Sequence, residues 1–129
     1  VRTRGERPLH CPRMSNIGPL SPSDVEGAKA AARCVVQVHE EMVRLVRPGM
    51  TLAQIDQHVA KTLERLGCKS CFLGYRQSLN DPKFPSHACL SVNECVVHGT
   101  AGYFTRPLRA GDVLKIDIGV SHKGWIGDA

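Results

Sequence analysis

An α+β fold, in which two helices pack on one face of an antiparallel sheet, is what the sequence predicts. From residue 21 to residue 66, apolar side chains recur every three or four positions, which is the period of amphipathic helices. After Gly67 the period shortens to about two and β-branched residues become frequent, as in strands. Helices that precede a run of strands, instead of alternating with them, favour helices on one face of an antiparallel sheet.

Length and composition limit what the chain can build. Its 129 residues, of which 42% are hydrophobic, support one modest core and exclude two full domains. No stretch approaches the roughly 18 consecutive apolar residues that span a bilayer, and the N-terminus has no apolar signal segment. We therefore expect a cytoplasmic protein without a membrane segment.

The formal net charge of +5 is concentrated at the N-terminus, where four arginines against one glutamate give residues 1–13 a net charge of +3. Pro8, Pro12 and Pro19, together with the absence of periodicity, predict that residues 1–20 are an extended basic lead-in before one domain over residues 21–129. A short basic arm is usually solvated, and contact with RNA or the ribosome is the alternative hypothesis. The nearly neutral body has no basic stripe interleaved with aromatic residues, so no specific nucleic-acid interface is expected.

Both predicted helices carry start and stop signals. The first is expected to begin at Ser21-Pro22-Ser23-Asp24, which supplies an N-cap hydroxyl, a proline for the first turn and an acidic side chain. It ends before Pro48-Gly49. The second is expected to begin at Thr51, with Gln54 as its capping-box partner, and to end at Gly67.

Strands are predicted over residues 71–75, 88–98 and 113–120, with a returning strand that starts at Trp125. A bend around Asn93 and Glu94 is the alternative to one straight strand over residues 88–98. Polar residues 76–83 form a loop after the first strand, and residues 122–124 form a turn before the last. The alternation is clearest in the third strand, where one face carries Leu114, Ile116, Ile118 and Val120.

The six cysteines allow three interpretations. Three disulfides are typical of small secreted domains, but helical cores without a signal segment favour reduced thiols. A structural zinc site is the alternative, because Cys68 and Cys71 form a C-x2-C pair that Cys89 and Cys95 follow. The second pair has five intervening residues instead of two, so we expect free thiols that behave as small apolar side chains.

Asp117 and Asp128 are the most informative pair of side chains. If the hairpin turn is centred on His122 and Lys123, the two aspartates are direct cross-strand partners with Cβ atoms about 4.5 to 5.5 Å apart. Like charges in that position destabilise a sheet, and a cation bound by both carboxylates would compensate, as in two-metal sites. Solvent exposure at a sheet edge, or a one-residue slip that turns Asp128 away, are the alternatives.

His98 is the histidine with the strongest claim to chemistry. It ends an apolar segment and precedes Gly99, so a small residue leaves room beside its imidazole. A strand-end imidazole can face the same surface as the aspartates, where it would donate a hydrogen bond or move a proton. A purely structural histidine is the alternative.

Several short motifs, in order and spacing, resemble those of type I methionine aminopeptidases. They are Phe84-Pro85, Ser91-Val92-Asn93-Glu94, Val97-His98-Gly99, Gly111-Asp112-Val113-Leu114-Lys115-Ile116-Asp117-Ile118-Gly119 and Gly127-Asp128-Ala129. The helical segments at residues 21–24 and 47–51 are also similar, so the resemblance extends from about residue 20 to residue 129. It implies the N-terminal half of the pita-bread metallopeptidase fold and removal of the initiator methionine from nascent proteins.

The resemblance also implies a set of site residues. Asp117 and Asp128 match the two aspartate ligands of a dinuclear metal centre, and His98 matches the histidine that hydrogen-bonds the substrate during catalysis. The positions that line the pocket for the methionine side chain are matched by Cys89, Phe84 and Tyr75. The implied cofactors are two divalent metal ions (Co, Mn, Fe or Zn), and the implied partners are the N-termini of nascent polypeptides.

Two features depart from the family pattern. The family's remaining histidine and two glutamate ligands match nothing in this sequence, so we expect a fragment that is inactive alone. Residues 76–83 also intervene before Phe84, where the family pattern is shorter. Two other hypotheses stand beside the aminopeptidase: a non-catalytic pita-bread module that binds protein or RNA, and a proline-specific peptidase of the same fold.

Overall fold

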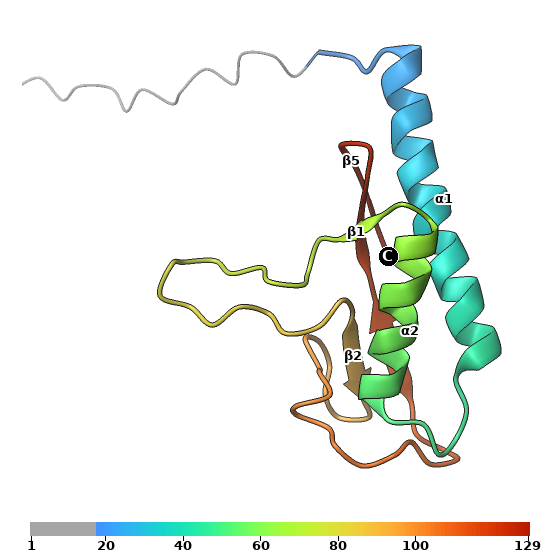
Figure 1. The fold of residues 1–129 in the computed structure, drawn as a ribbon, viewed down its shortest axis with the longest axis vertical. Helices are drawn as coiled ribbons and strands as arrows, with labels where there is room; N and C mark the ends of the chain where they lie inside the picture. Colours follow the sequence, from blue (N-terminus) through green and yellow to red (C-terminus); the bar gives the residue numbers. More distant parts are fainter. Residues whose placement is uncertain (1–17) are drawn as a thin grey trace, which may run out of the picture.

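A computed structural model describes residues 18–129 (Figure 1). The elements follow in the order α1 (Pro22–Leu45), α2 (Leu52–Arg65), β1 (Lys69–Ser70), β2 (Cys89–Val92), β3 (Leu114–Asp117), β4 (Gly119–His122) and β5 (Trp125–Asp128). Most of the predicted basic lead-in, residues 1–17, lies outside the described residues. Between residues 18 and 129, no helix is long and apolar enough to cross a membrane.

Both predicted helices are confirmed, including their caps. Ser21 Oγ accepts a hydrogen bond from the Asp24 backbone N–H at 3.2 Å, and Asp24 Oδ2 accepts one from the Ser21 N–H at 2.9 Å. Thr51 and Gln54 form the same reciprocal capping box at the start of α2. Beyond the end of α2, Gly67 takes a φ of +66°, a left-handed conformation that glycine enters without steric cost.

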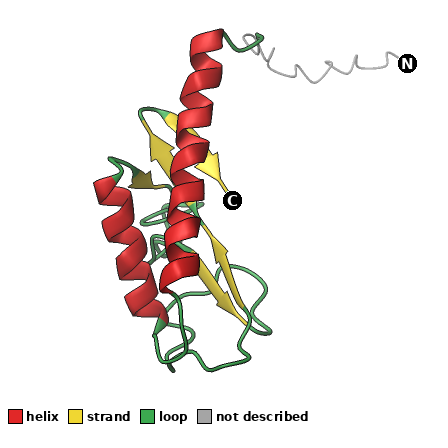
Figure 2. Ribbon diagram, turned by 90° about the vertical axis from the view of Figure 1, so that its right-hand side faces the viewer, coloured by secondary structure: helices red, strands yellow, loops and turns green. Residues whose placement is uncertain are grey.

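Two small antiparallel sheets lie beside the helices, one with the order β1-β4-β5 and one formed by β2 and β3. Helix α1 packs along β4 and β5, while α2 runs beside α1 and contacts β1. Figures 1 and 2 show both helices on the same side of the strands. The predicted α+β class is therefore confirmed, with the sheet divided in two.

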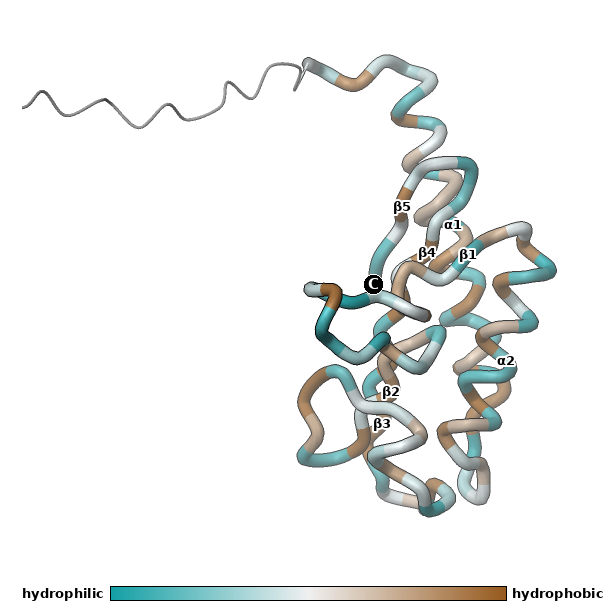
Figure 3. The backbone as a smooth tube through the Cα atoms, turned by 60° about the vertical axis from the view of Figure 1, so that its left-hand side comes forward, coloured by the Kyte–Doolittle hydropathy of each residue, from teal (hydrophilic) through white to brown (hydrophobic). Residues whose placement is uncertain are grey.

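The core fills the space between the helices and the sheets. Figure 3 shows apolar and polar segments alternating along both helices, as amphipathic helices require. The large side chains of this core are Val35, Val38, Met42, Leu52, Ile55, Val59, Leu63, Leu90, Val92, Leu108, Ile118 and Val120.

One of the predicted strands does not form, and another is shorter than expected. Residues 71–75 form no strand: β1 ends at Ser70, because the Ser70 hydroxyl accepts hydrogen bonds from the backbone N–H groups of Phe72 and Leu73 and turns the chain. In place of a strand over residues 88–98, β2 ends at Val92, because Asn93 takes a left-handed φ of +54°. Residues 93–98 form a largely exposed turn.

The predicted strand over residues 113–120 is divided between the two sheets. Strand β3 pairs with β2, whereas β4 pairs with β1 and β5. Ile118 joins the two strands and exchanges backbone hydrogen bonds with Ala129. Asp117, the last residue of β3, therefore stands where the two sheets meet.

Candidate metal centre

A cavity of about 330 Å³ opens at the junction of the two sheets. Its lining residues come from the segments before and after β2, from β2 itself and from the ends of β3 and β5. They are Phe72, Phe84, Cys89, His98, Asp117 and Asp128. The structure thus brings together every residue named from the sequence except Tyr75, and it adds Phe72.

Asp117 and Asp128 reach this cavity by a different register from the predicted one. Asp117 lies opposite Cys89 of β2, and Asp128 lies opposite Gly119 of β4, so the prediction of direct opposition is wrong. The hairpin turn is Lys123-Gly124, with φ values of +50° and +87°, as a two-residue primed turn requires. The register is shifted by two residues, which preserves the alternation of faces, and both carboxylates line the same cavity.

The two carboxylates repel each other in the cavity. Burial raises the pKa of Asp117, and the charge of Asp128 raises it further. A hydrogen bond from the Cys89 thiol and the charges of His98 and His39 act in the opposite direction on that pKa. A divalent cation would remove the repulsion, and carboxylate oxygens are ligands that such ions accept, so the donor set fits a metal.

The backbone around His98 fixes this residue beside the aspartates. Its φ of +57° lies in the left-handed region, which is unusual for a residue with a side chain. Gly99 packs so closely on β2 that a Cβ atom there would lie 2.7 Å from the Ser91 Cα. The Gly99 N–H donates to Ser91 Oγ at 3.0 Å, and the Leu90 N–H donates to the Gly99 carbonyl at 2.8 Å. These contacts hold the turn that carries the imidazole to the cavity.

The Cys89 thiol forms an uncharged part of the wall. Burial, followed by the charge of Asp117, raises the pKa of Cys89 to about 11. A backbone hydrogen bond from His98 opposes this shift without cancelling it. The thiol is therefore protonated at neutral pH and presents a small apolar surface instead of a nucleophile.

Phe72 and Phe84 form the aromatic wall. Their rings meet edge to face, with centroids 6.3 Å apart and planes at 84°. Gly119 leaves room for the first ring, because a Cβ atom at Gly119 would lie 2.7 Å from Phe72 Cε1. Tyr75, which the sequence comparison with the family named, is 62% exposed and lies outside the cavity lining. In a regular strand Phe72 and Tyr75 would face opposite sides of the sheet. A strand that placed Tyr75 in the cavity would therefore have pointed Phe72 away from it.

Residues 76–83 do not displace the aromatic wall. The Gly74 N–H donates to the Phe84 carbonyl and the Phe84 N–H donates to the Tyr75 carbonyl, each at 2.8 Å. The segment therefore leaves and returns at one point, as the loop that extends from the body in Figure 1 shows. Phe84 consequently stays in contact with Phe72 despite the intervening residues.

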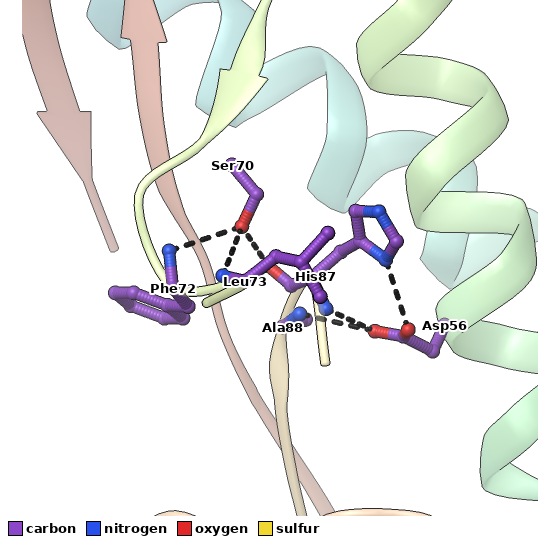
Figure 4. A network of polar contacts seen from close by, with 6 residues as sticks. All are labelled: Asp56, Ser70, Phe72, Leu73, His87 and Ala88. Atoms are coloured by element: carbon purple, nitrogen blue, oxygen red, sulfur yellow. Dashed lines mark hydrogen bonds and ion pairs between the residues drawn. The ribbon is translucent and has the colours of Figure 1, made fainter. Parts of the chain in front are cut away.

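A polar network ties the walls of the cavity to α2 (Figure 4). Asp56 Oδ1 accepts hydrogen bonds from the backbone N–H groups of His87 and Ala88 at 2.8 and 3.1 Å, and Asp56 Oδ2 lies 3.0 Å from His87 Nδ1. The His87 carbonyl accepts a hydrogen bond from Ser70 Oγ, the hydroxyl that turns the chain into Phe72. One carboxylate on α2 thus links the start of β2 to the Phe72 turn.

Paired carboxylates beside an imidazole, on an α+β frame, are typical of a metal-dependent hydrolase. The chain belongs to metallopeptidase family M24, whose family model matches residues 18–129. It is 31% identical over 109 residues to the methionine aminopeptidase of Aquifex aeolicus, and it covers 42% of that protein with 84% of its own length. It is 33% identical over 109 residues to methionine aminopeptidase 1 of Bacillus subtilis, of which it covers 41%.

Solved structures agree with these relatives and with the predicted resemblance to the pita-bread fold. The methionine aminopeptidase of Thermotoga maritima superposes with a TM-score of 0.73 at 29% identity, over 84% of this chain and 41% of that one. The enzyme from Rickettsia prowazekii gives a TM-score of 0.75 at 25% identity, with the same coverage. The chain therefore spans about two fifths of the length of the relatives that it matches.

Proposed function

We propose that residues 21–129 form the N-terminal half of the catalytic unit of a methionine aminopeptidase, which removes the initiator methionine from nascent polypeptides in the cytoplasm. The observation that carries the proposal is the convergence of Asp117, Asp128 and His98 beside an aromatic wall in one cavity. Membership of a metallopeptidase family and the names of the relatives support this class of reaction.

Asp117 and Asp128 are the proposed ligands for two divalent ions. When bound, such ions polarise a carbonyl group and lower the pKa of water. Carboxylate ligands accept cobalt, manganese, iron or zinc, so the proposal covers any of these. Two carboxylates leave most coordination positions to groups outside this chain, and we therefore propose that the chain alone binds metal weakly and has no peptidase activity.

The other lining residues would position the substrate. Phe72, Phe84 and Cys89 border an apolar space suited to the flexible side chain of methionine, whose sulfur packs favourably against aromatic rings. The His98 imidazole would donate a hydrogen bond to the carbonyl of the scissile peptide or move a proton. A positioned group of this kind contributes about 10² to 10⁴ in rate.

The decisive experiment measures hydrolysis of Met-Ala and X-Pro peptides. The protein assayed is a longer one, in which this chain is followed by the remaining part of the catalytic unit that its relatives contain. We expect cleavage of Met-Ala peptides, with His98→Ala lowering kcat/KM by about 10² to 10⁴ at unchanged metal content. His58→Ala, on the exposed side of α2, is the matched control and should retain full activity. Preference for X-Pro peptides would favour the proline-specific alternative, and an unchanged kcat/KM would remove His98 from the mechanism.

The basic arm at residues 1–13 is the proposed contact with the ribosome. Its net charge of +3 suits the phosphate backbone of RNA, and such contacts weaken steeply with salt. Co-sedimentation with ribosomes at low and high salt, with and without residues 1–13, tests this part separately from catalysis. Equal sedimentation of both forms would contradict it.

A further inference from the structure

Cys34, Cys68 and His122 bring two thiols and an imidazole together outside the candidate metal centre. One ligand atom from each, the two sulfurs and a ring nitrogen, lies within 4.8 Å of the other two. Three separate segments supply them: the middle of α1, the residue after the Gly67 cap, and the end of β4. The cysteine spacing in the sequence pointed to Cys71 instead, because contacts between α1 and the hairpin cannot be seen in spacing.

This Cys2His cluster lies on the opposite face of the three-stranded sheet from the cavity. Ile118 and Val120 pack in the core with both cysteines, and alternation along β4 places His122 on their face. Gly119 faces the other way, against Phe72 of the cavity wall. The cluster therefore shares no side chain with the Asp117 and Asp128 site.

The donor atoms and their spacing suit zinc. Thiolate and imidazole are its usual protein ligands, and tetrahedral zinc with bonds of about 2.3 Å to sulfur and 2.0–2.1 Å to nitrogen requires S···S and S···N separations of about 3.8 and 3.6 Å. The present separations reach at most 4.8 Å. Closing the site thus needs a contraction of about 1 Å, which small rotations of the three side chains would have to supply.

The three proposed ligands differ in burial. Cys34 and Cys68 are each 8% exposed, whereas His122 is only half-buried at the end of the hairpin. The imidazole therefore marks the side from which an ion would enter, and where a water would complete its coordination. Buried cysteines often serve only as small apolar side chains, but that role does not require an imidazole beside two thiols.

We propose that Cys34, Cys68 and His122 bind one zinc ion, with water as the fourth ligand. The ion would join α1, the end of α2 and the β4–β5 hairpin, so binding would stabilise the packing of the helices on the sheet. This role is separate from the proposed peptidase chemistry, and it is tested on the 129-residue chain without any measurement of activity.

The test titrates the reduced, metal-free chain with Co²⁺, which gives thiolate-to-metal charge-transfer absorption only when sulfur is a ligand. We expect this absorption to saturate at one equivalent, to disappear on addition of Zn²⁺, and to be absent from Cys34→Ser and Cys68→Ser. Two matched controls should retain it: Cys95→Ser, which removes a thiol outside the cluster, and Asp117→Asn, which removes a carboxylate of the other site.

His122→Gln tests the cluster without changing the core, because this side chain lies at the half-buried end of the hairpin. We expect it to weaken Co²⁺ binding by at least about tenfold, with both thiols still reduced. Absence of the charge-transfer absorption in the unaltered chain, its persistence in Cys34→Ser, or formation of a Cys34–Cys68 disulfide in place of metal uptake would each overturn the proposal.

Discussion

Gly127 of β5 lies directly against the backbone of Ala31 in α1. A Cβ atom at Gly127 would lie 2.6 Å from the Ala31 carbonyl oxygen and 2.9 Å from the Ala32 nitrogen. Asp128 is the next residue, so the approach of the strand to the helix sets where this carboxylate enters the cavity. The candidate site therefore depends on the packing of α1 as well as on its own lining residues.

We expect Gly127→Ala to destabilise the chain and to weaken metal binding. The added methyl group would meet backbone atoms that cannot rotate away, so β5 must shift, and overpacking of this kind costs about 1–3 kcal/mol. Urea unfolding measures the free energy, and calorimetry with Mn²⁺ measures the effect on the site. Gly102→Ala is the matched control, because the nearest atom to a Cβ there is 3.7 Å away. Equal unfolding midpoints for both variants would contradict the argument.

The Asp56 network should hold the start of β2 in place. Asp56→Ala removes the acceptor of two backbone N–H groups, those of His87 and Ala88, and loss of partly buried hydrogen bonds costs about 1–3 kcal/mol. We expect lower stability and faster amide hydrogen exchange at these two residues. Gln57→Ala, at the exposed neighbouring position of α2, should leave both quantities unchanged. Unaltered exchange in Asp56→Ala would show that the strand holds its place without the carboxylate.

The helices could be predicted from the sequence because their signals are local. The N-cap at Ser21, the capping box at Thr51 and the glycine cap at Gly67 depend only on neighbouring residues, and the structure confirms each of them. The register of the β4–β5 hairpin depends on which two residues form its turn. Glycine at the second turn position favours Lys123-Gly124, a signal present in the sequence but not used in the prediction.

The site was predictable mainly where its residues belong to sequence motifs. Asp117, Asp128 and His98 were named from an assumed hairpin register and a strand end, and again from the motifs; the register was wrong, but the structure places all three around one cavity. Phe72 was missed because its direction is set by a hydrogen bond from its own backbone to Ser70 Oγ, a contact that has no periodic signature.

Acid should weaken the loop that precedes β3. Arg106 donates two hydrogen bonds to Asp112, at 2.8 and 2.9 Å, and together with a hydrogen bond from Asn93 it holds the pKa of Asp112 well below its usual value. Because the folded pKa lies below the unfolded pKa of about 3.9, this stabilisation is present above that pH and is lost as the pH falls through the folded value.

We therefore expect Asp112→Asn to lower the urea midpoint at pH 7 and to reduce the dependence of the midpoint on pH between about 2 and 5. Asp81→Asn, in the loop at residues 76–83, is the matched control. Its urea midpoint should depend on pH in the same way as that of the unaltered chain. Parallel pH profiles for Asp112→Asn and the unaltered chain would contradict the assignment.

Asp117 should give the opposite pH dependence in the metal-free protein. Burial, and then the charge of Asp128, raise the pKa of Asp117. The native state therefore holds this proton more tightly than the unfolded chain does, and stability falls as the pH rises from about 3.9 through the native value. In EDTA we expect Asp117→Asn to have a higher urea midpoint than the unaltered chain at pH 7, and the two midpoints to converge near pH 3.

A divalent cation should remove the same repulsion. Mn²⁺ is then expected to raise the free energy of unfolding of the unaltered chain at pH 7, by about 2.7 kcal/mol at a concentration a hundredfold above Kd, and to change that of Asp117→Asn much less. Asp81→Asn should respond like the unaltered chain, because its side chain lies outside the cavity. If Asp117→Asn is the less stable protein at pH 7 in EDTA, and Mn²⁺ stabilises both proteins equally, the repulsion is absent and Asp117 is not a ligand.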